Sequence, residues 1–190
     1  RSMKLALLAD VHSNLEALTA CLDHAAEQGA ERHVFVGDLV GYGADPVAVL
    51  ETVQSRVERG ALVVQGNHDA AVDGSTEGMN AAAAEAIAWT RRQLGERQRA
   101  FLSGLPMLLR CENAVFVHGS AAAPEKWTYV SDPLRAASSL QAAAASYVFC
   151  GHVHEPILYY TGAAARPVSF RPVPGKPIPV PSYRRWLVVV

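Results

Sequence analysis

The chain has 190 residues, 50% of them hydrophobic, and a formal net charge of -1 at pH 7. A chain of this length can bury one substantial core, so we expect a single domain over residues 3–190. Its near-neutral charge gives no basic field for a polyanion, which disfavours a stable nucleic-acid complex but not a small phosphorylated substrate held by metal ions.

The cysteines and the chain ends indicate a cytoplasmic protein. Cys21, Cys111 and Cys150 form no CxxC pair and are predicted to be reduced core residues. No apolar stretch is long enough to span a membrane, and the first strand begins too early to leave room for a signal peptide. Residues 1–2 are interpreted as a cloning remnant, and the apolar run at residues 186–190 suggests that the natural chain continues.

The first part of the chain alternates strands with helices. Apolar runs predict strands at residues 5–9, 33–36 and 61–65. Leucines at helical spacing behind Ser13 as the N-cap predict a helix over residues 13–28, and Asp45-Pro46 is expected to begin a second helix. This order is typical of parallel βαβ units.

The second part adds more helices and then antiparallel strands. Helices are predicted over residues 80–94, 96–102 and 133–145, and strands over residues 114–117, 147–150, 157–161, 167–171 and 183–190. A loop is expected at residues 119–132, and the proline-rich residues 172–181 cannot form a central strand. The oligomeric state is left open, although the apolar last strand could pair with another chain.

Five of the apolar runs end at residues that can bind metals or move protons. These residues are Asp10 with His12, Asp38, Asn67-His68-Asp69, His118, and His152 with His154. Ligands bind beyond the carboxyl ends of the strands in α/β sheets, so we expect these side chains to gather in one place.

The first two of these strand ends favour a shared cation. Asp10 and His12 lie two residues apart, so strand alternation would direct both toward one ion. Asp38 has two carboxylate oxygens and can bridge this ion to a second one.

The remaining ligands suit the second cation. Asn67 and His118 offer one oxygen and one nitrogen, and His152 and His154 can divide themselves between the two ions. Mixed nitrogen and oxygen ligation suits Mn, Fe, Zn or Ni better than Ca or Mg. The absence of thiolate ligands argues against a structural zinc site.

The remaining loop residues favour proton transfer. His68 can donate or accept a proton near neutral pH, and Asp69 could either fix the tautomer of that imidazole or cap a helix. Gly66 lets the backbone turn before any side chain interferes.

Other polar and aromatic residues allow two interpretations each. Tyr42, Trp127 and Tyr129 could line a substrate pocket or serve as ordinary packing. Arg91 and Arg92 could contact phosphate or lie on a solvated helix face.

The ordered motifs resemble those of a known superfamily. The set Asp10-x-His12, Gly37-Asp38, Gly66-Asn67-His68-Asp69, His118 and Gly151-His152-x-His154 resembles the calcineurin-like metallophosphoesterases, and residues 37–43 and 118–120 resemble their small prokaryotic branch. The resemblance covers roughly residues 4–155. It implies a four-layer α/β/β/α sandwich with two mixed sheets and a two-metal site along one edge.

The resemblance also implies a set of ligands. It assigns Asp10, His12, Asp38 and His154 to one metal, and Asp38, Asn67, His118 and His152 to the other. The expected cofactors are two divalent transition-metal ions, with Mn favoured over Fe, Zn or Ni.

The expected reaction is hydrolysis of a phosphate mono- or diester of a small molecule or nucleotide. A hydroxide bridging the two ions would attack phosphorus in line, and His68, held by Asp69, would protonate the leaving oxygen. The arginine that serine/threonine phosphatases of the superfamily carry beside the second motif is absent near Tyr42, which argues against a phosphoprotein phosphatase. The alternative is a catalytically inactive interaction module on the same fold.

Overall fold

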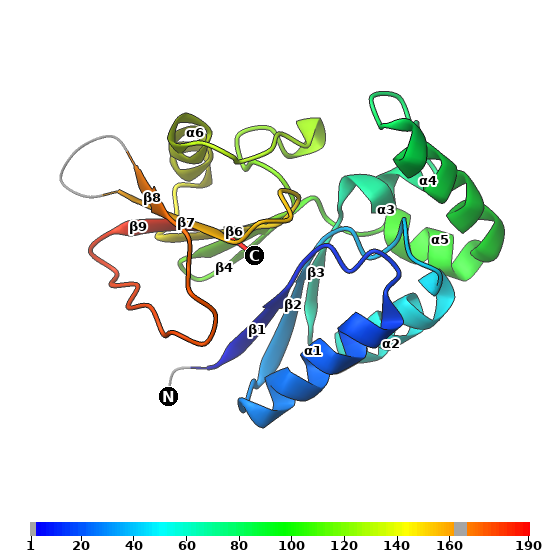
Figure 1. Ribbon diagram of the computed structural model, residues 1–190, viewed down its shortest axis with the longest axis horizontal. Helices are drawn as coiled ribbons and strands as arrows, with labels where there is room; N and C mark the ends of the chain where they lie inside the picture. The colour runs from blue at the N-terminus through cyan, green and yellow to red at the C-terminus, as the bar shows by residue number, and fades with distance from the viewer. Residues whose placement is uncertain (1–2, 162–166) are drawn as a thin grey trace. The chain divides into compact units, whose positions relative to one another are not determined.

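The chain forms two β-sheets with helices around them. The computed structural model describes residues 3–161 and 167–190, and within these it contains six α-helices (Figure 1). The α/β class with two sheets is therefore confirmed, but the prediction that both sheets are mixed is wrong, because the described strands of the three-stranded sheet pair only in parallel. Contacts divide the chain into two compact units, Arg1–Pro106 (unit 1) and Met107–Val190 (unit 2). The single domain over residues 3–190 and the four-layer arrangement stay predictions.

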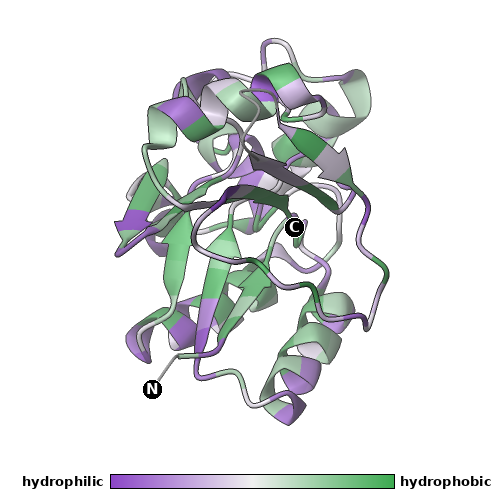
Figure 2. Cartoon of the chain, turned by 90° about the vertical axis from the view of Figure 1, so that its left-hand side faces the viewer, coloured by the Kyte–Doolittle hydropathy of each residue, from purple (hydrophilic) through white to green (hydrophobic). Residues whose placement is uncertain are grey.

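Unit 1 is built on a parallel sheet in the order β1-β2-β3. Its strands are β1 (Leu5–Leu8), β2 (Arg32–Val36) and β3 (Leu62–Val64), and its connecting helices are α1 (Leu15–Glu27) and α2 (Pro46–Glu58). Leu18 and Leu22 of α1 and Leu50 of α2 share one buried cluster with Phe35 and Val63 of the sheet. The strands are largely hydrophobic while the helices alternate in hydropathy, as expected for helices covering a sheet (Figure 2).

Two local predictions for unit 1 are corrected by the structure. The N-cap of α1 is Asn14, whose side chain accepts a hydrogen bond from Ala17 N; Ser13 has a φ of 56° and donates its backbone N–H to the Leu39 carbonyl. The segment after β3 is not only a loop, because Asn67 begins the short helix α3 (Asn67–Ala71).

The rest of unit 1 is helical, as predicted. Helix α4 spans Ala81–Gln93 and α5 spans Glu96–Ser103. Asn80 caps α4 by accepting a hydrogen bond from Ala83 N at 2.9 Å.

Unit 2 contains a six-stranded mixed sheet in the order β4-β5-β6-β9-β7-β8. Its strands are β4 (Leu108–Cys111), β5 (Ala114–Val117), β6 (Tyr147–Cys150), β7 (Ile157–Thr161), β8 (Val168–Phe170) and β9 (Arg185–Val189), with the helix α6 (Pro133–Ala143) and the 3-10 turn η1 (Pro124–Lys126). Ala136 and Leu140 of α6 pack in one core with Val115, Val148 and Leu187 of the sheet.

Strand β4 was not predicted from the sequence, and the expectation that β9 could pair with another chain is wrong. Strand β4 is only four residues long and pairs with β5 through a tight hairpin, so its short apolar run gave little signal. Strand β9 lies inside the sheet, parallel to β6 and antiparallel to β7. Because both of its edges are already paired, β9 is not available to pair with another chain, contrary to the prediction.

The cysteine prediction also needs correction. Cys150 is buried, but Cys111 is partly exposed and Cys21 is exposed on α1. Cys21 therefore does not belong to the core. Within residues 3–161 and 167–190, no helix combines the length and the apolar character needed to cross a bilayer.

Candidate metal centre

The predicted ligands of unit 1 lie directly after its three parallel strands. Asp10 and His12 follow β1, Asp38 follows β2, and Asn67 begins α3 after β3. Because the strands are parallel, the turns that follow them lie at the same edge of the sheet.

Backbone hydrogen bonds, not strand alternation, bring Asp10 and His12 together. Strand β1 ends at Leu8, and the φ angles of Asp10, His12 and Asp38 are 53°, 48° and 52°. Asp10 N donates to the Gly37 carbonyl at 3.1 Å and His12 N donates to the Asp38 carbonyl at 2.9 Å. Left-handed torsions in non-glycine residues persist where the surrounding structure requires them, and here these bonds do so.

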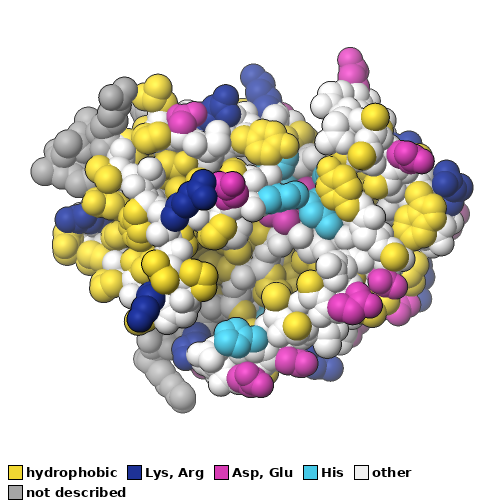
Figure 3. Space-filling model, in the orientation of Figure 1, with side chains coloured by type: hydrophobic (Ala, Val, Ile, Leu, Met, Phe, Trp, Pro, Cys, Tyr) yellow, Lys and Arg dark blue, Asp and Glu magenta, His cyan; other side chains and the backbone are white. Residues whose placement is uncertain are grey.

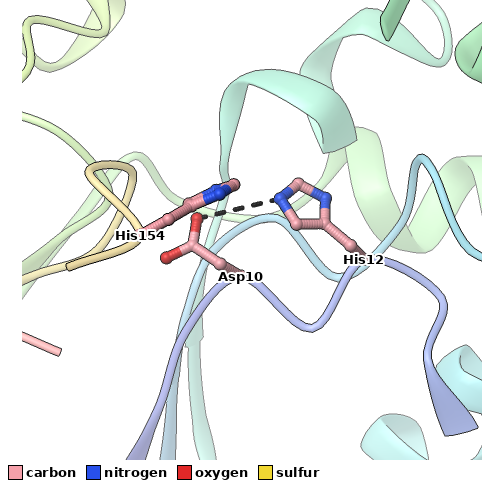
Figure 4. A group of neighbouring side chains, drawn as sticks. All are labelled: Asp10, His12 and His154. Atoms are coloured by element: carbon pink, nitrogen blue, oxygen red, sulfur yellow. Dashed lines mark ion pairs between the residues drawn. The ribbon is translucent and has the colours of Figure 1, made fainter. Parts of the chain in front are cut away.

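The His12 imidazole faces two carboxylates with one nitrogen. Its Nε2 lies 4.0 Å from Asp10 Oδ1 and 3.8 Å from Asp38 Oδ2; the first pair is drawn in Figure 4. Its Nδ1 lies 3.2 Å from the Val40 carbonyl oxygen, which can only accept a hydrogen bond. Nδ1 therefore carries a proton, and Nε2 is the nitrogen that faces the carboxylates and could bind a cation, as in metal-binding imidazoles.

Asp38 is fixed by the loop that follows β3. Its Oδ1 accepts a hydrogen bond from the backbone N–H of His68 at 2.9 Å. A Cβ atom at Gly66 would collide with Asp38 Oδ1 and with the Asp38 backbone nitrogen. The φ of Gly66 is -100°, an ordinary value, so the turn itself does not require glycine, contrary to the expectation from the sequence. Glycine is required because Asp38 approaches this position closely.

Asp69 joins the loops after β2 and β3. Its side chain is 1% exposed; Oδ1 accepts from Leu39 N at 2.9 Å and Val40 N at 3.2 Å, and Oδ2 accepts from Gly66 N at 2.9 Å. The capping interpretation of Asp69 is therefore confirmed. Its influence on the tautomer of His68 stays a prediction.

His68 lies close to two of the predicted ligands. One ligand-capable atom from each of His12, Asp38 and His68 lies within 4.8 Å of the others. The sequence assigned His68 only to proton transfer. This geometry makes it a possible nitrogen ligand as well.

The predicted ligands of unit 2 also follow parallel strands. His118 comes directly after β5, while His152 and His154 lie in the turn after β6 with φ angles of 70° and 61°. His118 Nε2 is 3.2 Å from His152 Nδ1. Both rings are buried and His154 is exposed.

Aromatic rings surround the two buried histidines of unit 2. Tyr129 stacks on His152 with a centroid distance of 3.8 Å and an interplanar angle of 14°. Trp127 contacts His118 edge-on at 6.1 Å. These aromatics of the long loop therefore pack against candidate ligands, an arrangement that the sequence could not distinguish from ordinary core packing.

The predicted residues thus follow strands in both units. Unit 1 carries Asp10, His12, Asp38, Asn67, His68 and Asp69, and unit 2 carries His118, His152 and His154. That both groups share the same ions stays a prediction.

The structure also assigns roles that the sequence did not. The Val40 carbonyl orients His12, and no residue type signals such a backbone contact. Arg91 donates to the carbonyls of Ala71 at 2.6 Å and Val72 at 2.8 Å. Arg91 therefore holds the end of α3. This role is neither of the two that the sequence allowed, a phosphate contact or a position on a solvated helix face.

The donor set of unit 1 fits a divalent cation. Carboxylate oxygens and an imidazole nitrogen of fixed tautomer converge there, and none of the three cysteines belongs to the group. Oxygen and nitrogen donors without thiolates suit Mn, Fe, Zn or Ni.

Comparisons with known proteins agree on one family. The family model described as the calcineurin-like phosphoesterase superfamily domain matches residues 3–172. A metallophosphoesterase from Sphaerobacter thermophilus is 31% identical, with a TM-score of 0.82 over 100% of this chain and 76% of that one.

Two archaeal proteins are also similar. A hypothetical protein from Pyrococcus horikoshii shares the fold at 20% identity, with a TM-score of 0.70 over 82% of this chain and 71% of that one. An uncharacterized protein of Methanocaldococcus jannaschii is 35% identical over 132 residues, which is 66% of this chain and 53% of the relative. The chain therefore spans about half the length of this curated relative.

Proposed function

Because this chain belongs to the calcineurin-like phosphoesterase superfamily, we propose that it hydrolyses phosphoric esters with the help of two divalent transition-metal ions. The observation that carries the proposal is the approach of His12 Nε2 to two carboxylates, at 4.0 Å from Asp10 Oδ1 and 3.8 Å from Asp38 Oδ2. These are residues of the motifs on which the resemblance rests.

The proposed ligands are those that the resemblance implies. Asp10, His12, Asp38 and His154 would hold one ion, and Asp38, Asn67, His118 and His152 the other. The orientation of His12 Nε2 toward two carboxylates supports the first set, and the 3.2 Å approach of His118 to His152 supports the second. Bound ions would supply an activated water and neutralise charge on the phosphoryl oxygens, and Mn suits this donor set.

The residues around the ions supply the remaining chemistry. His68 would hold the proton that the leaving oxygen needs, and its backbone N–H orients Asp38. Asp69 keeps the loops that carry Asp38 and His68 in register through its three backbone hydrogen bonds. The proposed substrates are phosphate mono- or diesters of a small molecule or nucleotide.

Metal analysis combined with two ester substrates tests the proposal. Purified protein would be stripped with a chelator, reloaded with Mn²⁺ and assayed on p-nitrophenyl phosphate and on bis(p-nitrophenyl) phosphate. We expect two bound ions per chain and hydrolysis of at least one ester, lost on chelation. Protein that holds its metal but cleaves neither ester would instead support the interaction module.

The role of His68 is tested by His68→Asn, with His24→Asn on the exposed face of α1 as the control. We expect kcat to fall by about 10²-fold or more, since general acids typically contribute that much. The loss should be larger for an alkyl ester than for a p-nitrophenyl ester, because the poorer leaving group depends more on protonation. A rate within about threefold of wild type would exclude this role.

A cytoplasmic location is part of the proposal. No disulfide joins Cys21, Cys111 or Cys150, all of which lie in the described part of the chain, and this suits a reducing compartment. The expected partner is the small phosphorylated substrate itself.

A further inference from the structure

Tyr42 is held in an unusual backbone conformation beside the candidate metal centre of unit 1. It has a φ of 60°, which is rare for a bulky side chain. Its side chain is nevertheless 48% exposed, so burial in the core does not explain why this conformation is maintained. Strained backbone persists where the surrounding structure over-determines it, and such positions cluster at active sites and ligand clamps.

The glycines on either side of Tyr42 lock it in place. A Cβ at Gly41 would collide with His68 Nδ1, and a Cβ at Gly43 would collide with the carbonyl oxygen of His12. The backbone N–H of Gly43 also donates to this oxygen at 2.9 Å. The segment Gly41-Tyr42-Gly43 is therefore packed directly against His12 and His68.

The Tyr42 ring lies next to both imidazoles. Its centroid is 4.9 Å from that of His12, nearly perpendicular at 70°, and 4.8 Å from that of His68, tilted by 46°. Since about half of the side chain stays exposed, the ring offers a surface to solvent beside the proposed proton donor. Hydrophobic side chains reach the surface on the face drawn in Figure 3.

From this geometry we propose that Tyr42 binds the organic group of the substrate, and that this group is a planar ring such as an aryl group or a nucleobase. The inference rests on the proposed function, in which His68 serves the leaving oxygen. A phenol ring carries no positive charge to hold phosphoryl oxygens. Its exposed face instead suits stacking on another planar ring.

Binding of two matched phosphonates tests this inference independently of turnover. Benzylphosphonate and cyclohexylmethylphosphonate differ in the planarity of the ring and cannot be hydrolysed as esters. With Mn²⁺-loaded protein in a calorimeter, we expect benzylphosphonate to bind about fivefold more tightly, a preference in the range of one aromatic contact. Tyr42→Leu should abolish the preference and Tyr42→Phe should keep it.

A control and the opposite results complete the test. Tyr183 is 81% exposed and precedes β9, at the end of the unit 2 sheet opposite to His118 and His152, so Tyr183→Leu should leave both affinities unchanged. Equal binding of the two phosphonates by wild type, or an unchanged preference in Tyr42→Leu, would overturn the inference. Ester hydrolysis by the same preparation reports separately on the proposed function, so the two failures can be told apart.

Discussion

The two units hold their candidate ligands by different means. In unit 1, the ligand loops are joined by backbone hydrogen bonds and by the Asp69 carboxylate, which accepts from three N–H groups. In unit 2, a backbone bond from Gly151 N to the His118 carbonyl also joins the ligand loops, but the buried side chains of His118 and His152 contact each other and the rings of Trp127 and Tyr129.

The difference has an energetic consequence. Hydrogen bonds to a charged group contribute about 1.5–3 kcal/mol each, and an aromatic pair contributes roughly 0.5–1.5 kcal/mol. The ligands of unit 1 should therefore be fixed before a cation binds, whereas those of unit 2 can adjust more easily. We expect changes to the polar network of unit 1 to cost more than changes to the rings of unit 2.

The largest effect is expected for Asp38→Asn. The amide keeps an oxygen for the His68 N–H but loses the charge that would bridge two cations. We expect kcat/KM to fall by about 10³-fold, the upper end of what one electrostatic group contributes. Metal content measured on the same protein should fall as well.

Asp23→Asn, on the exposed face of α1, is the matched control for this change of charge. Asp38→Asn protein that kept both its metal content and its rate would show that this carboxylate does not bridge ions.

Asp69→Asn tests the polar network itself. Its amide nitrogen cannot accept a hydrogen bond, so at least one of the three backbone N–H groups loses its acceptor. We expect metal affinity to fall by about 10- to 100-fold and the free energy of unfolding by about 2 kcal/mol. Titration with Mn²⁺ and denaturant unfolding measure the two quantities, and unchanged metal affinity would contradict the role given to this network.

The sequence predicted the strand ends well because strands leave local signals. Apolar runs predicted β1, β2, β3, β5 and β6. In the structure, the candidate ligands follow these five strands. Strand β4 was not predicted because its four residues form a strand by pairing with β5, while their own pattern gives little signal. The interior position of β9 likewise depends on β6 and β7, which are distant in sequence.

The geometry of the ligands could not be predicted in the same way. Strand alternation was the wrong reason for bringing Asp10 and His12 together, because β1 ends before them and backbone bonds to the next loop set their torsions. The need for Gly66 also comes from another loop, through its contact with Asp38. These features depend on tertiary contacts, which a local pattern does not encode.

Tyr129→Leu tests how much the aromatic contacts of unit 2 contribute to metal affinity. It removes the ring that stacks on His152 at 3.8 Å, and Tyr129 is itself 51% exposed, so little core is lost. We expect Mn²⁺ affinity to fall by about two- to tenfold, as for one aromatic contact. Tyr129→Phe should stay within about twofold of wild type, and a loss in Tyr129→Leu as large as in Asp69→Asn would break the comparison.

The smallest expected effect is a difference between the two units in how pH changes the free energy of unfolding. Burial, with a further contribution from Arg56, lowers the pKa of His33 on β2 from its ordinary 6.5. As pH drops, His33 is therefore protonated in the unfolded chain before it is protonated in the folded chain. Because of this, the free energy of unfolding falls as pH drops below about 6.5, and it levels off below the folded-state pKa. In unit 2, burial and the charges of Asp132 and Cys150 raise the pKa of Tyr159 above 10.0. Stability linked to Tyr159 is therefore lost only as pH rises above about 10.

Denaturant unfolding of His33→Gln and Tyr159→Phe at about pH 7.5 and pH 5 distinguishes these contributions. The acid-induced drop in unfolding free energy should be smaller in His33→Gln than in wild type, because the glutamine cannot take up the proton. Tyr159→Phe should lower stability equally at both pH values, since it loses only the weak hydrogen bond to the Val130 carbonyl at 3.4 Å. If the drop is as steep in His33→Gln as in wild type, the acid sensitivity comes from other groups, and the candidate metal ligands of unit 1 become the next to substitute.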